Sequence, residues 1–268
     1  MSQPQILLTN DDGILSPGLW AAAGALSELG FVHVAAPRDQ YSAAGRSMPI
    51  TSDGIIEVRE VTVNGNTWKV HAVGGTPAQA VQHGILEIMP VKPDLVVAGI
   101  NFGENPGSGV TISGTVGAAL EGASFGIPAL AISLETEQKH HYSHSNQVDF
   151  SAAAYFTRFF GHLLLNKSLP EDVDVLKVDI PCDATVETPW AVTRLSRRPY
   201  FEPTMPERPS WDIPVRLGYH IIENYEDDAP DTDIYAVFVR RIVSVTPLSL
   251  DLTSRLDLAA FESELRKD

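Results

Sequence analysis

Short apolar segments alternate with segments of helical periodicity as far as residue 180. Five of the apolar segments have the length of buried strands, at residues 5–8, 31–36, 94–98, 129–133 and 173–180. This alternation is the pattern of a parallel sheet covered by helices on both faces, because a connection between parallel strands must cross over the sheet. We therefore predict an α/β fold.

Helix starts support this prediction. Ser16 followed by Pro17 is a typical N-cap and first helical residue, and so is Thr76 followed by Pro77. Apolar spacing predicts a further helix at residues 148–165. These helices lie between the predicted strands, where a parallel sheet needs them.

A hairpin and a β-rich tail complete the pattern. Residues 55–63 and 67–72, joined through Asn64-Gly65, are typical of a β-hairpin. Beyond residue 185 the chain is rich in proline, and we predict short strands at residues 219–222, 234–239 and 242–245. We expect one domain spanning residues 1–268, with a core at 1–185 and an appended β-hairpin region at 186–268.

Charge and cysteine content exclude several classes of function. The formal net charge of -15 argues against a nucleic-acid polymer or an anionic membrane as partner, and basic residues form only short pairs such as Arg197-Arg198. The single cysteine, Cys182, excludes an intrachain disulfide, and we interpret it as a bystander. We find no signal-peptide pattern and no apolar run long enough to span a membrane. We expect a cytoplasmic protein.

Two adjacent carboxylates, Asp11 and Asp12, follow the first predicted strand. Ligands bind at the carboxyl ends of the strands in open α/β sheets. At an effective dielectric constant near 20, two charges ~4 Å apart repel by about 4 kcal/mol, and a bound divalent cation reverses the sign of this energy. We favour a metal site over the alternative, in which Asp12-Gly13 is a turn and Asp11 a helix cap.

Two further oxygen donors follow other strands. Ser42 lies in the loop after the second strand, and Asn101 lies in a glycine-rich loop after residue 98. Taken singly, each is more typical of a turn residue that bonds its own backbone. Together with the acidic pair, and with no Cys or His in these loops, they predict oxygen-only ligation, which suits Mg²⁺ or Mn²⁺ rather than Zn²⁺.

A glycine-rich helix start, Ser113-Gly114-Thr115, supplies a second element. A helix N-terminus offers free backbone N–H groups to an anion, and a glycine allows a close approach. An ordinary capped helix, with small residues for tight packing, explains this segment equally well. Combined with a metal site, the segment predicts hydrolysis of a phosphate monoester, in which the metal neutralises charge and activates water.

Several motifs resemble the SurE (survival protein E) family in order and spacing. They are residues 6–14, 36–42, 75–78, 93–101 and 113–122, with later matches at 192–194, 232–233 and 243–248. The resemblance covers nearly the whole chain. It implies a Rossmann-like three-layer αβα core with a mostly parallel sheet, a protruding hairpin, and a C-terminal segment exchanged between the subunits of a homo-oligomer, either a dimer or a tetramer.

The resemblance also implies an activity. Members of this family are metal-dependent 5′/3′-nucleotidases, so we expect hydrolysis of nucleoside monophosphates by metal-activated water, and possible action on short polyphosphate. One divalent cation per subunit, Mg²⁺ or Mn²⁺, is the implied cofactor. The implied partners are a small-molecule substrate and further copies of the chain.

The family's site residues carry over by motif. The implied metal ligands are Asp11, Asp12, Ser42 and Asn101, and the implied phosphate-proximal residues are Asn105, Ser113, Gly114 and Thr115. We assign the catalytic role to Asp11, Asp12 and Asn101, and we add Asn10 to the residues near the substrate.

The chain departs from the family pattern at five positions. Ala43 replaces the Gly that usually follows the metal-ligand serine, Gln79 and Ala80 replace Asp-Cys, Gly109 replaces an acidic residue, and Ile112 replaces Tyr. Because the expected metal ligands are intact, these changes concern substrate preference and rate rather than reaction class.

Two other classes of function share part of the pattern. A non-catalytic, metal-binding regulatory module of the receiver type also has an acidic pair after its first strand. It needs an aspartate acceptor at the end of a middle strand, where this chain has Asn101. Dinucleotide binding needs a Gly-x-Gly-x-x-Gly turn after the first strand, which this sequence lacks. We interpret the histidine-rich segment 139–144 as a solvated loop rather than a metal cluster.

Overall fold

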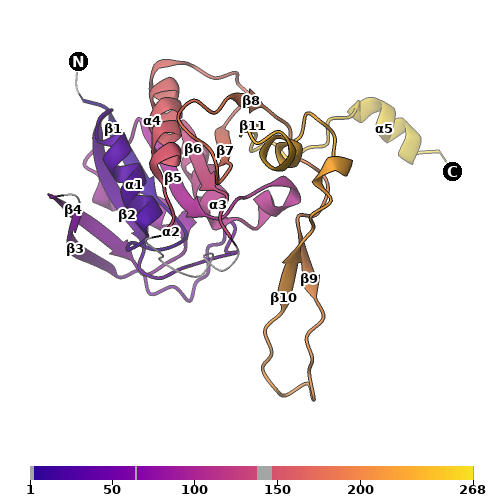
Figure 1. Cartoon of the computed structure of the whole chain (residues 1–268), viewed down its shortest axis with the longest axis horizontal. Helices are drawn as coiled ribbons and strands as arrows, with labels where there is room; N and C mark the ends of the chain where they lie inside the picture. The colour runs from indigo at the N-terminus through magenta and orange to yellow at the C-terminus, as the bar shows by residue number, and fades with distance from the viewer. Residues whose placement is uncertain (1–2, 64, 138–146, 268) are drawn as a thin grey trace.

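A nine-stranded sheet runs through the molecule in the order β3-β4-β2-β1-β5-β6-β7-β11-β8 (Figure 1). The computed structural model describes residues 3–63, 65–137 and 147–267. The strands of this sheet are β1 (Gln5–Thr9), β2 (Phe31–Pro37), β3 (Ile56–Val63), β4 (Asn66–Val73), β5 (Leu95–Phe102), β6 (Ala129–Leu134), β7 (Val175–Ile180), β8 (Trp190–Val192) and β11 (Val243–Leu248).

The centre of the sheet is parallel and buried. Strands β2, β1, β5, β6 and β7 pair in parallel, as the alternating sequence pattern predicted. Every residue of β5, β6 and β7 is buried. Strands covered on both faces are expected to be almost continuously apolar, and β5 and β6 follow this pattern, whereas β7 carries Lys177 and Asp179 among its apolar residues.

Helices cover both faces of the sheet. Helices α1 (Pro17–Leu26) and α4 (Ser151–Asn166) pack with Ile6 and Leu8 of β1, and helices α2 (Pro77–His83) and α3 (Gly114–Ser124) pack on the opposite face with Leu7. Neighbouring residues of a strand point to opposite faces, so one short strand feeds two apolar cores. The Rossmann-like α/β prediction is confirmed. The remaining helical segments are η1 (Gly84–Ile88), η2 (Gly107–Thr111), η4 (Tyr225–Asp227), η5 (Tyr235–Val239) and α5 (Leu258–Leu265).

The late region joins the sheet. Strand β11 pairs antiparallel with β7 and parallel with β8. The sheet therefore continues across the boundary that we expected at residue 185. The predicted strand at 234–239 is wrong, because this run forms the helical turn η5. Thr232 starts that turn by accepting bonds from the Tyr235 N–H on its hydroxyl, at 3.3 Å, and from the Ala236 N–H on its carbonyl, at 3.0 Å.

Two parts project from this body (Figure 1). Strands β9 (Phe201–Thr204) and β10 (Gly218–Ile221) form a separate antiparallel hairpin, and α5 carries the C-terminus away from the sheet. Among the helices of the described ranges, none is long and apolar enough to cross a membrane. The histidine-rich segment at 139–144 lies outside the described residues.

Candidate metal and phosphate site

The acidic pair lies where the loops after three adjacent strands meet. β1 lies between β2 and β5, so the carboxyl ends of these strands share one edge of the sheet. The loop after β2 is tied to the pair by the Tyr41 N–H, which donates to the Asp11 carbonyl at 2.7 Å. The end of β5 is tied to it by the Phe102 N–H, which donates to Asp12 Oδ2 at 3.0 Å.

Asp11 contacts the start of α3 directly. The Thr115 hydroxyl donates to Asp11 Oδ1 at 2.5 Å. A side chain on Gly114 would place its Cβ 2.7 Å from Asp11 Cβ, so only glycine allows the helix to approach this closely. The fold thus brings the acidic pair and the glycine-rich helix start, two elements more than 100 positions apart in sequence, into one site.

Asp12 is linked to Ser42 through a single amide group. Gln40 Nε2 donates to Asp12 Oδ1 at 3.3 Å and to the Ser42 hydroxyl at 3.0 Å. Gln40 therefore links Ser42, in the loop after β2, to the acidic pair. Sequence reasoning did not single out Gln40, because one glutamine in a polar loop carries no pattern of its own.

Asn101 presents an oxygen at the end of β5. Its Nδ2 donates to the Gly103 carbonyl at 2.6 Å, which leaves Oδ1 as the atom it can offer to a cation. The pairing register of β5 with β6 shifts between Ala98 and Asn101. Such an irregularity changes the direction of the residues that follow it, and here the Phe102 N–H beyond it contacts Asp12.

Asn10 is buried beside the pair and has an unpaired oxygen. Its Nδ2 donates to the Gly13 carbonyl at 3.0 Å, while its Oδ1 has no hydrogen-bond partner within the described chain. The hydroxyls of Thr9 and Ser16 are also buried without a hydrogen-bond partner within the described chain. Ser16 occupies the predicted N-cap position of α1, but its side chain makes no capping bond. Burying an oxygen atom without a hydrogen-bond donor costs free energy. Such an oxygen is well suited to bind a cation, which interacts with its lone pairs.

The electrostatics of the pair fit a hard cation. Asp11 and Asp12 are 6% and 3% exposed. Burial raises the pKa of both carboxyls, and the charge of Asp11 raises that of Asp12 further. A divalent cation bound between them would reverse both effects, since an opposite charge favours the ionised form. The oxygen-only donor set matches the preference of Mg²⁺-like ions.

Comparison with known proteins identifies the family. The family described as "Survival protein SurE" matches residues 6–202. The chain belongs to the SurE family. The protein named "5'-nucleotidase SurE" from Thermococcus gammatolerans is 43% identical, with 97% of this chain and 96% of the relative covered. A relative of the same name from Archaeoglobus fulgidus is 44% identical over 96% of each chain.

A solved structure of the family supports the fold. The crystal structure of the SurE protein from Aquifex aeolicus superposes with a TM-score of 0.76 and is 32% identical, covering 98% of this chain and 100% of that one. The membership predicted from the motifs is therefore confirmed.

Two residues that the SurE motifs place near the phosphate have protein partners here. The Ser113 hydroxyl accepts the Val116 N–H at 3.1 Å and so caps α3. Asn105 Nδ2 donates to the Ser133 hydroxyl at 2.8 Å, on β6 rather than on the acidic pair. The backbone N–H groups of Gly114 and Thr115, at the start of α3, point to the Asp11 carboxylate and partly offset the rise in its pKa that burial causes, so the helix end already interacts with a negative charge.

Two departures from the SurE pattern have local explanations. Gln79 completes a capping box for α2: its N–H donates to the Thr76 hydroxyl at 3.2 Å, and its Oε1 accepts the Thr76 N–H at 3.0 Å. Ala43 has a φ of 59°, in the left-handed region that favours glycine. The chain therefore holds an unfavourable backbone conformation next to Ser42.

A second group of potential metal ligands, Glu135, Cys182 and Asp183, follows the carboxyl ends of β6 and β7, further along the same edge of the sheet. Arg241 Nη2 lies 2.7 Å from a Glu135 oxygen, 2.6 Å from an Asp183 oxygen and 3.4 Å from Cys182 Sγ. A guanidinium therefore already balances these carboxylates. Burial and Glu135 raise the pKa of the Cys182 thiol, which is the opposite of an activated thiolate.

Proposed function

We propose that the protein is a metal-dependent 5′/3′-nucleotidase that releases phosphate from nucleoside monophosphates, and that it also cleaves short polyphosphate. The observation that carries this proposal is the direct contact between Asp11 and the start of α3. Residues suited to a cation and a helix end suited to a phosphate group share one site. The names of the relatives support the same reaction class.

Four residues would hold one divalent cation, Mg²⁺ or Mn²⁺: Asp11, Asp12, Ser42 and Asn101. Such a cation, when bound, neutralises phosphate charge and lowers the pKa of water. The protein's part is orientation. Thr115 fixes the Asp11 carboxylate, and the Phe102 N–H together with Gln40 fixes that of Asp12. We assign the phosphate group to Asn105 and to the segment Ser113-Gly114-Thr115 at the start of α3, and Asn10 to the substrate side.

The receiver-type alternative is not favoured. An acyl-phosphate acceptor must be a carboxylate, and the middle strand β5 has Asn101 as its last residue but one, at the corresponding place. The same position is well suited to a neutral oxygen ligand.

The test is phosphate release from a panel of nucleoside 5′- and 3′-monophosphates. The protein is first treated with a chelator and then supplied with Mg²⁺ or Mn²⁺. We expect no release after chelation and recovery with either metal. The control is Asp183→Asn, which alters the second carboxylate cluster and should leave the metal dependence unchanged. Release that survives exhaustive chelation, or no release from any monophosphate, would refute the proposal.

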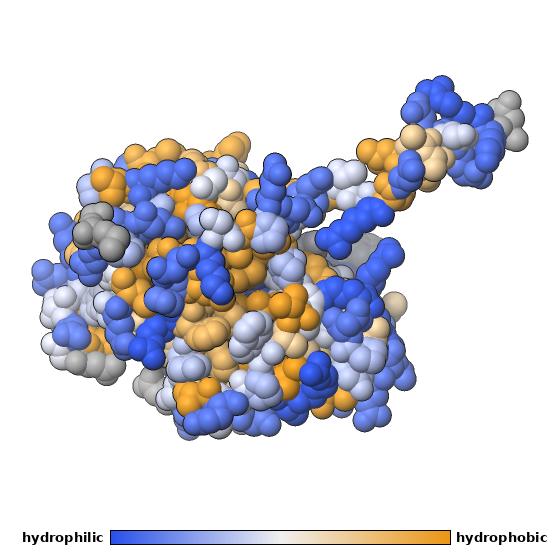
Figure 2. Space-filling model, turned by 90° about the horizontal axis from the view of Figure 1, so that it is seen from above, coloured by the Kyte–Doolittle hydropathy of each residue, from blue (hydrophilic) through white to orange (hydrophobic). Residues whose placement is uncertain are grey.

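We further propose that the chain acts as a homo-oligomer, either a dimer or a tetramer, and that its C-terminal segment is exchanged between subunits. Met205 and Trp211, near the tip of the β9–β10 hairpin, are 94% and 91% exposed. The segment around α5 stands clear of the body and carries apolar residues among polar ones (Figure 2). Apolar side chains on projecting elements are expected at protein interfaces.

The domain organisation and the location are part of the same proposal. We propose that residues 1–268 act as one domain, which the participation of β8 and β11 in the main sheet supports. We place the protein in the cytoplasm, which the single cysteine favours.

A further inference from the structure

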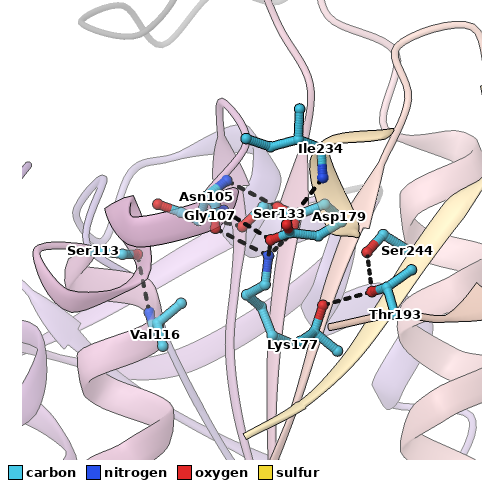
Figure 3. Close-up of polar contacts among 12 residues, drawn as sticks. Asn105, Gly107, Ser113, Val116, Ser133, Lys177, Asp179, Thr193, Ile234 and Ser244 are labelled. Atoms are coloured by element: carbon cyan, nitrogen blue, oxygen red, sulfur yellow. Dashed lines mark hydrogen bonds and ion pairs between the residues drawn. The ribbon is translucent and has the colours of Figure 1, made fainter. Parts of the chain in front are cut away.

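A fully buried ion cluster lies beside the loop that leads from β5 to α3 (Figure 3). It consists of Lys177 and Asp179 on β7 and of Asp233, which comes just before η5; all three are 0% exposed. Lys177 Nζ forms an ion pair with Asp179 and lies 3.0 Å from Asp233 Oδ2. With one positive and two negative charges, the cluster carries a net charge of −1 when all three are ionised.

Each member of the cluster holds the backbone of residues 105–107. Lys177 Nζ donates to the Asn105 carbonyl at 3.0 Å, and Asp179 Oδ1 accepts the Asn105 N–H at 2.8 Å. Asp233 Oδ2 accepts the Gly107 N–H at 2.8 Å. Figure 3 shows the side chains of Lys177 and Asp179 close to Asn105 and Gly107. Charged groups thus fix both ends of a short stretch of main chain.

Burying this cluster is expensive for a purely structural purpose. Buried ion pairs are often replaced by apolar residues with no loss of stability, because desolvation offsets the attraction. Burial lowers the pKa of Lys177, but the two aspartates outweigh it and raise that pKa overall. Burial likewise raises the pKa of Asp233, but Lys177 and backbone N–H groups bring it below its ordinary value. Both shifts favour the charged forms of Lys177 and Asp233, which make the directional hydrogen bonds to the loop.

The fixed segment connects both halves of the candidate site. Asn101 lies four residues before Asn105, and from Gly107 the chain passes through η2 to Ser113, the cap of α3. Gly107 leaves little room for movement, since a Cβ there would lie 3.0 Å from the Arg198 carbonyl. A shift of residues 105–107 would consequently move Asn101 and the start of α3 relative to each other.

We propose that Lys177, Asp179 and Asp233 are positioning residues for the phosphate hydrolysis, and that they act by fixing the backbone of residues 105–107. This inference rests on the proposed function, because it assigns the loop to that reaction. None of the three touches the acidic pair in the contacts described above, so their effect passes through the loop.

The decisive comparison is between Asp179→Ala and Asp179→Asn. The alanine variant removes the acceptor of the Asn105 N–H, whereas asparagine keeps an oxygen of the same shape. We expect Asp179→Ala to lower kcat by roughly tenfold to 100-fold with little change in KM, since a small misplacement of catalytic groups costs about this much. Asp179→Asn should retain most of the activity. Equal kcat values for the alanine variant and the parent would overturn the proposal.

Thr246→Val is the matched control. Thr246 is buried on β11, directly opposite Lys177, and its hydroxyl bonds that of Thr193 at 2.8 Å. This substitution disturbs the same part of the sheet without touching residues 105–107. We expect a lower Tm and an unchanged kcat. If Thr246→Val lowers kcat as much as Asp179→Ala does, the cluster is merely structural and the proposal fails.

A readout without catalysis separates this inference from the proposed function. Hydrogen exchange of peptides covering residues 103–113 should be faster in Asp179→Ala than in the parent and in Thr246→Val. Unchanged exchange would refute the positioning role, whereas an inactive parent with the expected exchange would refute only the nucleotidase. If Asp179→Ala does not fold, the neutral pair Lys177→Met with Asp179→Asn replaces it. That pair removes the bond to the Asn105 carbonyl, so it should exchange faster than Asp179→Asn alone.

Discussion

The site edge of the sheet and the projecting parts of the molecule differ in which side chains they bury and which they expose. At the site edge, charged and polar groups such as Asp11 and Asp12 are buried and held by neighbours from several strands. In the hairpin and in α5, apolar groups such as Trp211 are exposed and have little of the chain around them. In our proposal, the first region binds a cation and the second contacts another protein surface.

Asp11→Asn probes the first region and should have the largest effect. It removes one charge from the proposed cation site while keeping the shape and the Thr115 contact. We expect kcat to fall by roughly 100-fold or more, as for the loss of a direct transition-state contact, with weaker metal binding. High metal concentration should recover part of the activity. An unchanged rate and metal dependence, or a trapped phospho-enzyme that makes Asp11 or Asp12 a nucleophile, would contradict the assignment.

Glu104→Gln tests a buried carboxyl group that links the site edge of the sheet to the base of the β9–β10 hairpin. Glu104 accepts bonds from the Tyr200 hydroxyl, at the base of the hairpin, and from the Thr136 N–H. Burial raises its pKa from 4.5 to about 7. A raised carboxyl pKa means that the folded state holds the proton more tightly, so stability falls as the pH rises from the unfolded value to the folded value.

Glutamine has no such titration. Relative to the parent, Glu104→Gln should therefore be more stable at pH 8 than at pH 4.5. Its free energy of unfolding minus that of the parent should rise between these pH values by at most about 3 kcal/mol. Urea denaturation of both proteins at the two pH values measures this difference. A difference that does not change with pH would show that Glu104 titrates as an ordinary surface carboxylate.

Phe261→Ser with Leu265→Ser tests the second region. No residue of α5 is buried, so this change should leave the Tm of the body unchanged. It should weaken self-association by roughly tenfold or more, because interface aromatic residues contribute disproportionately. Light scattering or sedimentation over a concentration series gives the result, with Ser263→Ala as the control on the same helix. A parent that is monomeric at micromolar concentration would remove the basis for this prediction.

Ala43→Gly is expected to have the smallest effect. The left-handed backbone costs a non-glycine residue about 1 kcal/mol, and the greater freedom of glycine in the unfolded chain offsets much of that gain. We expect a net stabilisation below about 1 kcal/mol, seen as a small rise in Tm. Ala44→Gly, at a position without a positive φ, should instead lower the Tm.

The sequence predicted the meeting of the site loops because a parallel sheet places strand ends at one edge. Asp11 and Ser42 follow strands and Asn101 lies at the end of one, and the order of predicted strands was enough to group them at one edge. The orienting contacts were not predictable in this way. Gln40 and the Phe102 N–H act through local geometry that has no period or motif.

Two other features show where pattern reasoning stops. Lys177 and Asp179 interrupt an otherwise apolar strand at alternate positions, a pattern in the sequence that marks the buried charged cluster. The error at residues 234–239 has a different cause: a short apolar run fits a strand or a helical turn, and the Thr232 cap decides between them. Tertiary and capping contacts supply what periodicity omits.

The segment between Arg194 and Thr232, which contains the β9–β10 hairpin, begins and ends at one place on the body of the protein. Arg194 and Thr232 form an isolated parallel bridge, with the Arg194 N–H donating to the Asp231 carbonyl and the Asp233 N–H donating to the Arg194 carbonyl, both at 3.0 Å. Loop-closure entropy grows slowly with length once the ends are pinned. The outer part of this segment can therefore change in length and in sequence, by evolution or by design. The main sheet and the edge that carries the candidate site would stay the same.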